Sequence, residues 1–372
     1  MKATERLQSP VRSKALTERV YRELMVPVFR GTGLGRTFLA LRLGRMLQDA
    51  FDTGERDRQR RLVEDARRLA VRFGREAKIA ALFARTLARL NHEASKDDDL
   101  RLEETTLQEL LALSKAHPSN AEARKCLAKV LYNTLAFDDR RRRSDRRLDL
   151  LEQLCALEQD GQEEPYIHGI IASGVFNALD QFEIERDYRN VKGALGRLKG
   201  MYVRHRQDRG VRSSYAKAIV SVLAEANEDI GKSVRASCLM ELRKLAGRHK
   251  DDLGVRSWLA YGLHNSRISV HAAGDLYGGV ALLREFELVA DSIEDDGVAA
   301  GLLAQGLFDA IAGAARQGDY ELRDTMLLKL RGLAETHRHD KAVREWLEKA
   351  HFHTGDSGAM MGTGRTRRAI GH

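Results

Sequence analysis

Residues 248–263 read RHKDDLGVRSWLAYGL, and an altered copy of this stretch, RHRQDRGVRSSYAKAI, occupies residues 204–219. The two copies start 44 residues apart, and they align the pair Arg204-His205 with the pair Arg248-His249. Self-similarity at a fixed period of roughly 20–50 residues is typical of repeat proteins, in which each unit buries its apolar face only against its neighbours. The chain is therefore expected to be an array of similar units.

Residues that lie 44 positions apart are of similar type along most of the chain. Two such series of residues are almost entirely apolar and predict a core. They are Ile79, Ala123, Ile167, Val211, Val255, Ala299 and Val343, and then Phe83, Leu127, Ile171, Tyr215, Leu259, Leu303 and Leu347. Three residues after the second set the side chains are mostly small: Thr86, Val130, Gly174, Ala218, Gly262, Gly306 and Ala350.

Composition indicates helices. The 372 residues include only 4 prolines and 6% aromatics, and apolar residues recur at spacings of three and four. Acids or Asn recur just before one predicted helix of each unit, where a side-chain oxygen accepts from free backbone N–H groups. This set is Glu76, Asn120, Glu164, Asp208, Asp252, Asp296 and Asp340. The preceding helix is expected to end near Phe73, His117, His205, His249 or His337.

The segment HPSNAEA at residues 117–123, followed by Leu127-Ala128, resembles the tetratricopeptide repeat family in its turn and in the Leu-Gly pair of the first helix. The resemblance implies an all-α fold, a right-handed α-solenoid of antiparallel helix pairs with about seven to eight repeats. It spans residues 36–353, between an N-terminal extension with a capping helix (1–35) and a flexible basic C-terminal tail (354–372).

Two departures from that family are visible. The family's period is about 34 residues, whereas the step here is 44. Where the family has an aromatic residue before the Leu-Gly pair, this chain has Arg124, His168, Arg212, Arg256 and Arg344. Helical repeats of the HEAT or armadillo kind have periods closer to 44 and are the structural alternative.

The resemblance also implies a groove along the inner face of the first helices. A protein or acidic peptide partner is expected there, because Lys and Arg pair with carboxylates and Asn amides bond a peptide backbone. The aromatic side chains would supply apolar contact area, unless they serve only packing between units. The candidate groove residues are Arg85, Lys129, Tyr132, Asn133, Phe176, Asn177, Lys217, Tyr261, His264, Asn265, Phe308 and Lys349.

The alternative function is association with nucleic acid. The net charge is +9, and residues 140–147 read RRRRSDRR, a run that could contact phosphates. The candidate contacts are Arg140, Arg141, Arg142, Arg143, Arg146 and Arg147, together with the basic tail. No stacking aromatic accompanies the run, and acids lie among its arginines, as in an ordinary solvated loop.

Other classes of function lack a signal. We identify no catalytic set of side chains and expect neither enzyme activity nor a cofactor. The paired histidines at 337, 339, 351 and 353 lie too far apart along one helix to share a metal ion. Three scattered cysteines and the absence of a long apolar stretch predict a cytoplasmic protein without a membrane span. Trp346 and Phe352 in the last unit leave self-association open.

Overall fold

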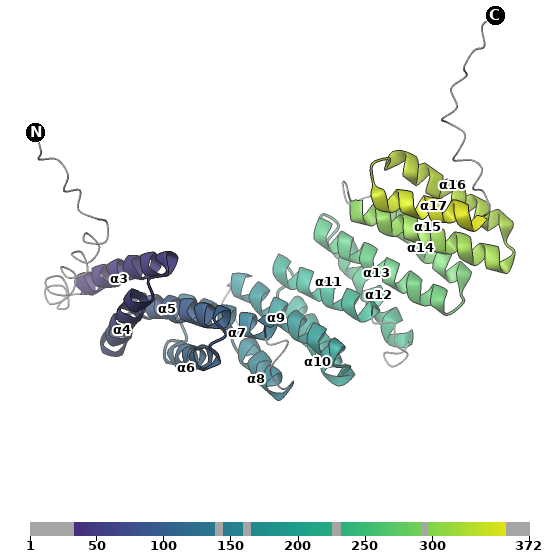
Figure 1. Ribbon diagram of the computed structural model, residues 1–372. Helices are drawn as coiled ribbons and strands as arrows, with labels where there is room; N and C mark the ends of the chain where they lie inside the picture. The colour runs from purple at the N-terminus through teal and green to yellow at the C-terminus, as the bar shows by residue number, and fades with distance from the viewer. Residues whose placement is uncertain are drawn as a thin grey trace, which may run out of the picture. The chain divides into compact units, whose positions relative to one another are not determined.

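The computed structural model describes residues 33–137, 144–158, 165–224, 232–291, 293 and 297–354. In this part of the chain all regular secondary structure is α-helical, which confirms the all-α part of the predicted fold (Figure 1). The helices are α3 (Gly33–Thr53), α4 (Arg56–Phe73), α5 (Ala77–Lys96), α6 (Leu100–Ala116), α7 (Ala121–Phe137), α8 (Ser144–Cys155), α9 (Pro165–Ile184), α10 (Tyr188–Arg204), α11 (Arg209–Ala224), α12 (Lys232–Arg248), α13 (Leu253–Ala272), α14 (Leu276–Ala290), α15 (Gly297–Gln317), α16 (Tyr320–Thr336) and α17 (Lys341–Thr354). The predicted capping helix at residues 16–26 and almost all of the basic tail lie outside the described residues.

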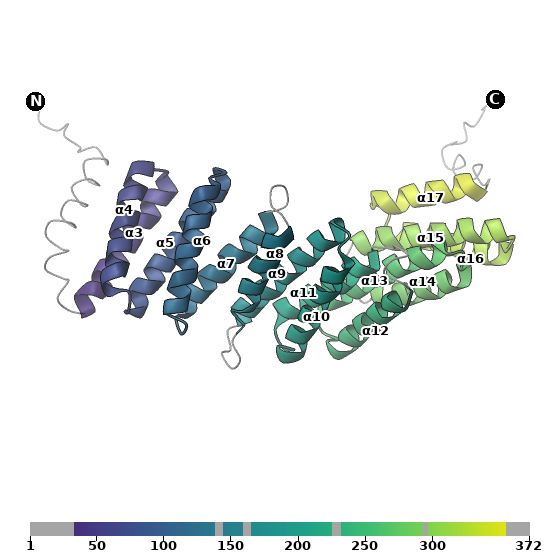
Figure 2. The same cartoon turned by 90° about the horizontal axis from the view of Figure 1, so that it is seen from below.

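The helices divide into two compact units, one ending at Gly174 and the other beginning at Val175. We call the odd-numbered helices first helices and the even-numbered ones second helices. In the first unit α3 packs on α5 and α5 on α7, and α4 and α6 lie along one side of this row (Figure 1). In the second unit α11 packs on α13 and α15 on α17, while α12 and α14 pack on the first helices before and after them (Figure 2). Helices therefore pack as neighbouring pairs in each unit.

Helix starts follow the predicted capping positions. Asn120, Asp208, Asp252 and Asp340 each accept a hydrogen bond from the backbone N–H three residues later, which satisfies one of the free donors at a helix N-terminus. Glu76 precedes α5 without such a bond and instead forms an ion pair with Arg36. The C-terminal positions His117, His205 and His337 also end their helices as expected.

The second helices have caps of their own, which the sequence analysis did not assign. Asp99, Asp187, Asp275 and Asp319 accept from the third backbone N–H that follows. The residue just before each of these acids has a positive φ, between 59° and 82°. At two of the four turns that residue is a glycine, the residue that adopts this conformation at least cost.

The closest approach between successive helix pairs occurs at the small-residue positions. A Cβ added to Gly262 of α13 would lie 2.4 Å from Leu242 of α12, and one added to Gly306 of α15 would lie 2.6 Å from Leu283 of α14. Gly174 of α9 faces Leu154 of α8 in the same way, at 2.3 Å. A glycine inside a helix costs about 1 kcal/mol relative to alanine. Its presence here admits the leucine of the preceding second helix.

Arg124 and Arg212, which share a position of the 44-residue step, both contact chain segments outside their own helices. The Arg212 guanidinium donates to Asp252 Oδ2 from Nε at 3.1 Å and from Nη2 at 2.7 Å. Burial alone would raise the pKa of the Asp252 carboxyl group. The Arg212 guanidinium and the Val255 amide lower it by more than burial raises it, so the pKa lies below its ordinary value. Arg124, only 2% exposed, donates to the Leu157 carbonyl. Arg212 therefore joins α11 to the start of α13, and Arg124 joins α7 to the segment that follows α8.

Successive second helices are also linked by ion pairs between residues 42 positions apart. In the first unit these are Arg67–Glu109 and Arg146–Glu104, and in the second Lys199–Glu241, Arg243–Glu285 and Lys329–Glu287. Partly exposed pairs of this kind contribute about 0.2–1 kcal/mol each. Many charged side chains of the second helices are thus paired with charged side chains of the neighbouring second helix.

Substitution at the close approach should destabilise the protein. Gly262→Val places carbon atoms where Leu242 now lies, and overpacking of this kind costs about 1–3 kcal/mol. Chemical denaturation monitored by circular dichroism measures the loss. Gly196→Ala in α10 is the matched control, since an added Cβ there meets nothing within 4 Å, and it should stabilise the protein by about 0.5–1 kcal/mol. Equal stability of the Gly262→Val variant and the parent would contradict the assigned contact.

Candidate functional site

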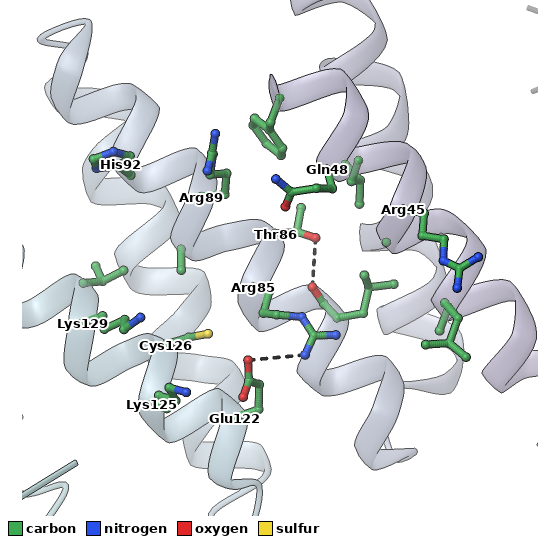
Figure 3. A pocket seen from close by; sticks show the side chains of 18 of the residues that line it. Arg45, Gln48, Arg85, Thr86, Arg89, His92, Glu122, Lys125, Cys126 and Lys129 are labelled. Atoms are coloured by element: carbon green, nitrogen blue, oxygen red, sulfur yellow. Dashed lines mark hydrogen bonds and ion pairs between the residues drawn. The ribbon is translucent and has the colours of Figure 1, made fainter. Parts of the chain in front are cut away.

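A cavity of about 610 Å³ lies in the first unit, over three successive first helices. Its walls come from α3, α5 and α7, whose side chains point into it in Figure 3. These helices pack side by side because each buries its apolar positions against the next. Side chains between those positions line the cavity, which we call the first-unit groove.

Most charged side chains of the first-unit groove are cationic. Arg45, Arg85, Arg89, Lys125 and Lys129 line it together with His92, and Glu122 is its acidic lining residue (Figure 3). Because like charges gathered in a concave surface reinforce one another's potential, the groove attracts anions.

Two of the arginines in the groove form long ion pairs with acidic side chains. Arg85 Nη1 lies 3.4 Å from Glu122 Oε1 across α5 and α7, and Arg89 Nη2 lies 3.5 Å from Asp52 Oδ1. Pairs of this length between exposed side chains are weak. A ligand carboxylate can therefore compete with these acids for either guanidinium.

The floor of the groove is uncharged. Thr86 donates its hydroxyl to the Leu82 carbonyl at 2.9 Å, so it does not face the groove as a free donor. Burial, aided by the charge of Glu122, raises the pKa of the Cys126 thiol to about 11. The thiol is therefore protonated at neutral pH. Leu41 is 60% exposed at the rim and offers apolar contact area to a ligand.

The structure brings three of the predicted groove residues together in this cavity, namely Arg85, Lys129 and Asn133. Tyr132 is half-buried and is not among the lining residues. The sequence analysis missed Arg89 and Lys125, although each lies one helical turn from a residue that it selected. Helical spacing of three and four from Arg85 and Lys129 would have identified them.

The predicted residues of the second unit form separate clusters. Lys217 Nζ lies 5.7 Å from the ring centre of Phe176 and 5.4 Å from that of Trp258, whose ring also contacts Tyr261. Near the C-terminus Lys349 Nζ lies 3.9 Å from the Trp346 ring, which packs on Phe308. Asn177 and Asn265 are both half-buried, and the Asn265 amide is directed to the Val220 carbonyl at 3.5 Å.

His264 departs from the sequence expectation. It is 5% exposed and packs against Phe286 of α14, so it belongs to the core between α13 and α14 and not to an accessible wall. Burial, followed by the positive charge of Arg267, lowers the pKa of His264 to about 4. A neutral imidazole in the core therefore occupies the position where a groove side chain was expected.

The arginine run contributes little to the described surface. Arg140, Arg141, Arg142 and Arg143 lie outside the described residues. Arg146 is paired with Glu104 of α6, and Arg147 is 3% exposed. Arg147 is thus too buried to contact a phosphate, and Arg146 would first have to leave Glu104.

The paired histidines and the cysteines do not gather into a metal site among the described residues. His337 ends α16, and His351 is 7% exposed within α17. Across the described ranges no cluster of three or more metal-ligating side chains occurs, and none of the three cysteines forms a disulfide. Among the helices that can be described, none has the length and apolarity needed to cross a membrane.

Comparison with known proteins does not assign the chain to a family. No protein-family model matches it, and no curated protein matches it significantly.

The buried histidine predicts a pH dependence of stability. The unfolded chain gains a proton on His264 near pH 6.5, whereas the folded chain does so only near pH 4. The unfolded state therefore binds more protons in this window, and stability falls as pH falls, by about 2 kcal/mol between pH 7 and pH 5. Denaturant titrations of the parent and of His264→Gln measure this. The difference in unfolding free energy between parent and variant should shrink by that amount, whereas a pH-independent difference would contradict the assignment.

Proposed function

We propose that the chain is a protein-interaction scaffold or adaptor that binds an acidic peptide or protein partner on the face of its first helices. In this proposal the helix pairs form a right-handed α-solenoid similar to tetratricopeptide repeats. The observation that carries the proposal is the first-unit groove, where five arginine and lysine side chains line one cavity with a single acid.

Two rows of cationic side chains, one on α5 and one on α7, could form ion pairs with such a partner. Arg85 and Arg89 stand one turn apart on α5, and Lys125 and Lys129 stand one turn apart on α7. One turn of helix places neighbouring side chains about 6 Å apart. Alternate residues of an extended peptide have nearly the same spacing, about 6.6 Å. Acidic side chains on one face of the peptide can therefore pair with either row.

Neutral contacts complete the binding surface. The Asn133 amide has both a donor and an acceptor for a peptide backbone, and Leu41 covers an apolar ligand side chain at the rim. Because the helices that position these groups are packed into the core, the backbone of the groove does not have to become ordered on binding. These neutral contacts supplement the cations, which give the groove its selectivity for acidic segments.

Charge reversal in the groove should abolish this binding selectively. Fluorescence anisotropy of a labelled octaglutamate peptide measures its affinity for the full chain. Arg85→Glu combined with Lys129→Glu should weaken binding at least tenfold, since two lost pairs plus the new repulsion exceed about 1.4 kcal/mol. Arg61→Glu with Arg101→Glu is the matched control, because both side chains are exposed on second helices, and this variant should bind within about twofold of the parent.

Two results would contradict the proposal. One is an equal loss of peptide binding in the groove variant and the control variant. The other is tight binding of a single-stranded DNA oligonucleotide that the groove reversals leave unchanged, which would favour the nucleic-acid alternative. Circular dichroism of both variants checks that the helices are intact.

A further inference from the structure

Lys217 has an unusual setting in the second unit. It extends from α11 between Phe176 of α9 and Trp258 of α13, with its Nζ 5.7 Å and 5.4 Å from the two ring centres. Both distances are within the range of about 6 Å in which a ring face attracts a cation. The side chain is half-buried and is thereby fixed between two rings.

The two rings attract the positive charge of Lys217, but they offer no oxygen or nitrogen atom to accept a hydrogen bond from its ammonium group. An ammonium carries three N–H donors. Within the described part of the chain Lys217 has cation–π contacts and no carboxylate or carbonyl partner. Because the rings have already displaced part of its water, an incoming oxygen anion meets a smaller desolvation cost than at a fully exposed lysine. The ammonium is therefore prepared to bind an anion.

The surroundings of Lys217 are aromatic. Trp258 and Tyr261 lie one turn apart on α13 with ring centres 5.6 Å apart, and they and Phe176 are all half-buried. Partly exposed rings of this size supply apolar contact area to a ligand. An apolar side chain can rest on these rings while an adjacent carboxylate reaches the ammonium.

A comparison with the cluster at Lys349 shows why Lys217 is the better anion site. Lys349 occupies the same position of the 44-residue step and contacts Trp346. The cavity beside it, of about 430 Å³, is lined by Glu345 and Glu348 as well as by Lys349. Two acids near one lysine repel a carboxylate ligand.

We infer that Lys217, Phe176, Trp258 and Tyr261 form a second binding subsite, specific for a peptide segment in which a carboxylate adjoins an apolar side chain. This inference rests on the proposed function in that the partner is acidic, but it assigns a separate site in the second unit with its own specificity. The first-unit groove selects charge, and the Lys217 subsite selects charge next to apolar surface.

Tryptophan fluorescence gives the subsite its own readout. The chain has two tryptophans, Trp258 and Trp346, so the Trp346→Phe variant reports on Trp258 alone. The probe is a capped peptide of alternating Glu and Leu, titrated into this full-length variant. We expect a saturable change in Trp258 emission, an affinity at least tenfold higher than for the Gln–Leu peptide of the same length, and weaker binding of a Glu–Gly peptide.

Further substitutions are made in the same Trp346→Phe background. Lys217→Gln should lower the affinity for the Glu–Leu peptide at least tenfold. Lys192→Gln, which removes the same charge from the exposed side of α10, should leave it unchanged. Lys129→Glu should also leave the Trp258 titration unchanged, because that residue belongs to the first-unit groove.

The outcomes separate this inference from the proposed function. If Lys217→Gln binds the Glu–Leu peptide as tightly as its parent, or if the Gln–Leu peptide binds equally well, the subsite is refuted while octaglutamate binding in the first unit is unaffected. If octaglutamate binding fails but the Trp258 titration is lost only in Lys217→Gln, the groove proposal is refuted and the subsite stands. Circular dichroism of Lys217→Gln excludes unfolding as the cause of a loss.

Discussion

Three first helices, α9, α13 and α15, lie close to the second helix before them because a glycine admits a leucine from that helix. Gly262 against Leu242 and Gly306 against Leu283 are the clearest cases, since a single added carbon atom would lie under 3 Å from the leucine. Protein interiors are packed so densely that this space cannot be occupied twice. Close packing between helix pairs, and with it the spacing of the surface side chains, depends on this contact.

Several charged residues of the two kinds of helix differ in what they contact, although some first helices also carry ion pairs such as Arg212–Asp252. Second helices direct Arg67, Arg243 and Lys329 to acids on the neighbouring second helix. First helices direct Lys129 and Lys217 to aromatic rings or into a cavity. Charges of the first kind contribute modestly to stability, whereas those of the second kind remain open to a ligand. This difference, more than the net charge of the chain, indicates that the face formed by the first helices is the one that binds a partner.

The predictable part of the structure follows from regular spacing. Caps such as Asp252 and core positions such as Val255 and Leu259 recur at the 44-residue step because similar backbone geometry and burial constrain them in several copies. The position of Lys129 was predictable for the same reason. Arg89 and Lys125 were missed because one repeat position was followed along the chain and the helical turn around it was not.

Other residues could not be assigned from spacing alone. His264 shares its repeat position with Tyr132, Phe176 and Phe308, yet it is in the core because Phe286 covers it. Arg212 differs from the residue expected in the tetratricopeptide family, and its role depends on a carboxylate 40 residues later in the chain. Such contacts depend on which side chains face each other across two helices, and a one-dimensional period does not contain that information.

We propose that an acidic partner binds the first helices and leaves the second helices uncovered. Hydrogen exchange measured by mass spectrometry, with and without saturating octaglutamate, tests this most directly. We expect slower amide exchange in α5 and α7, with exchange in α4 and α6 unchanged. Protection confined to α4 and α6, or no protection in either set of helices at saturating peptide, would contradict it.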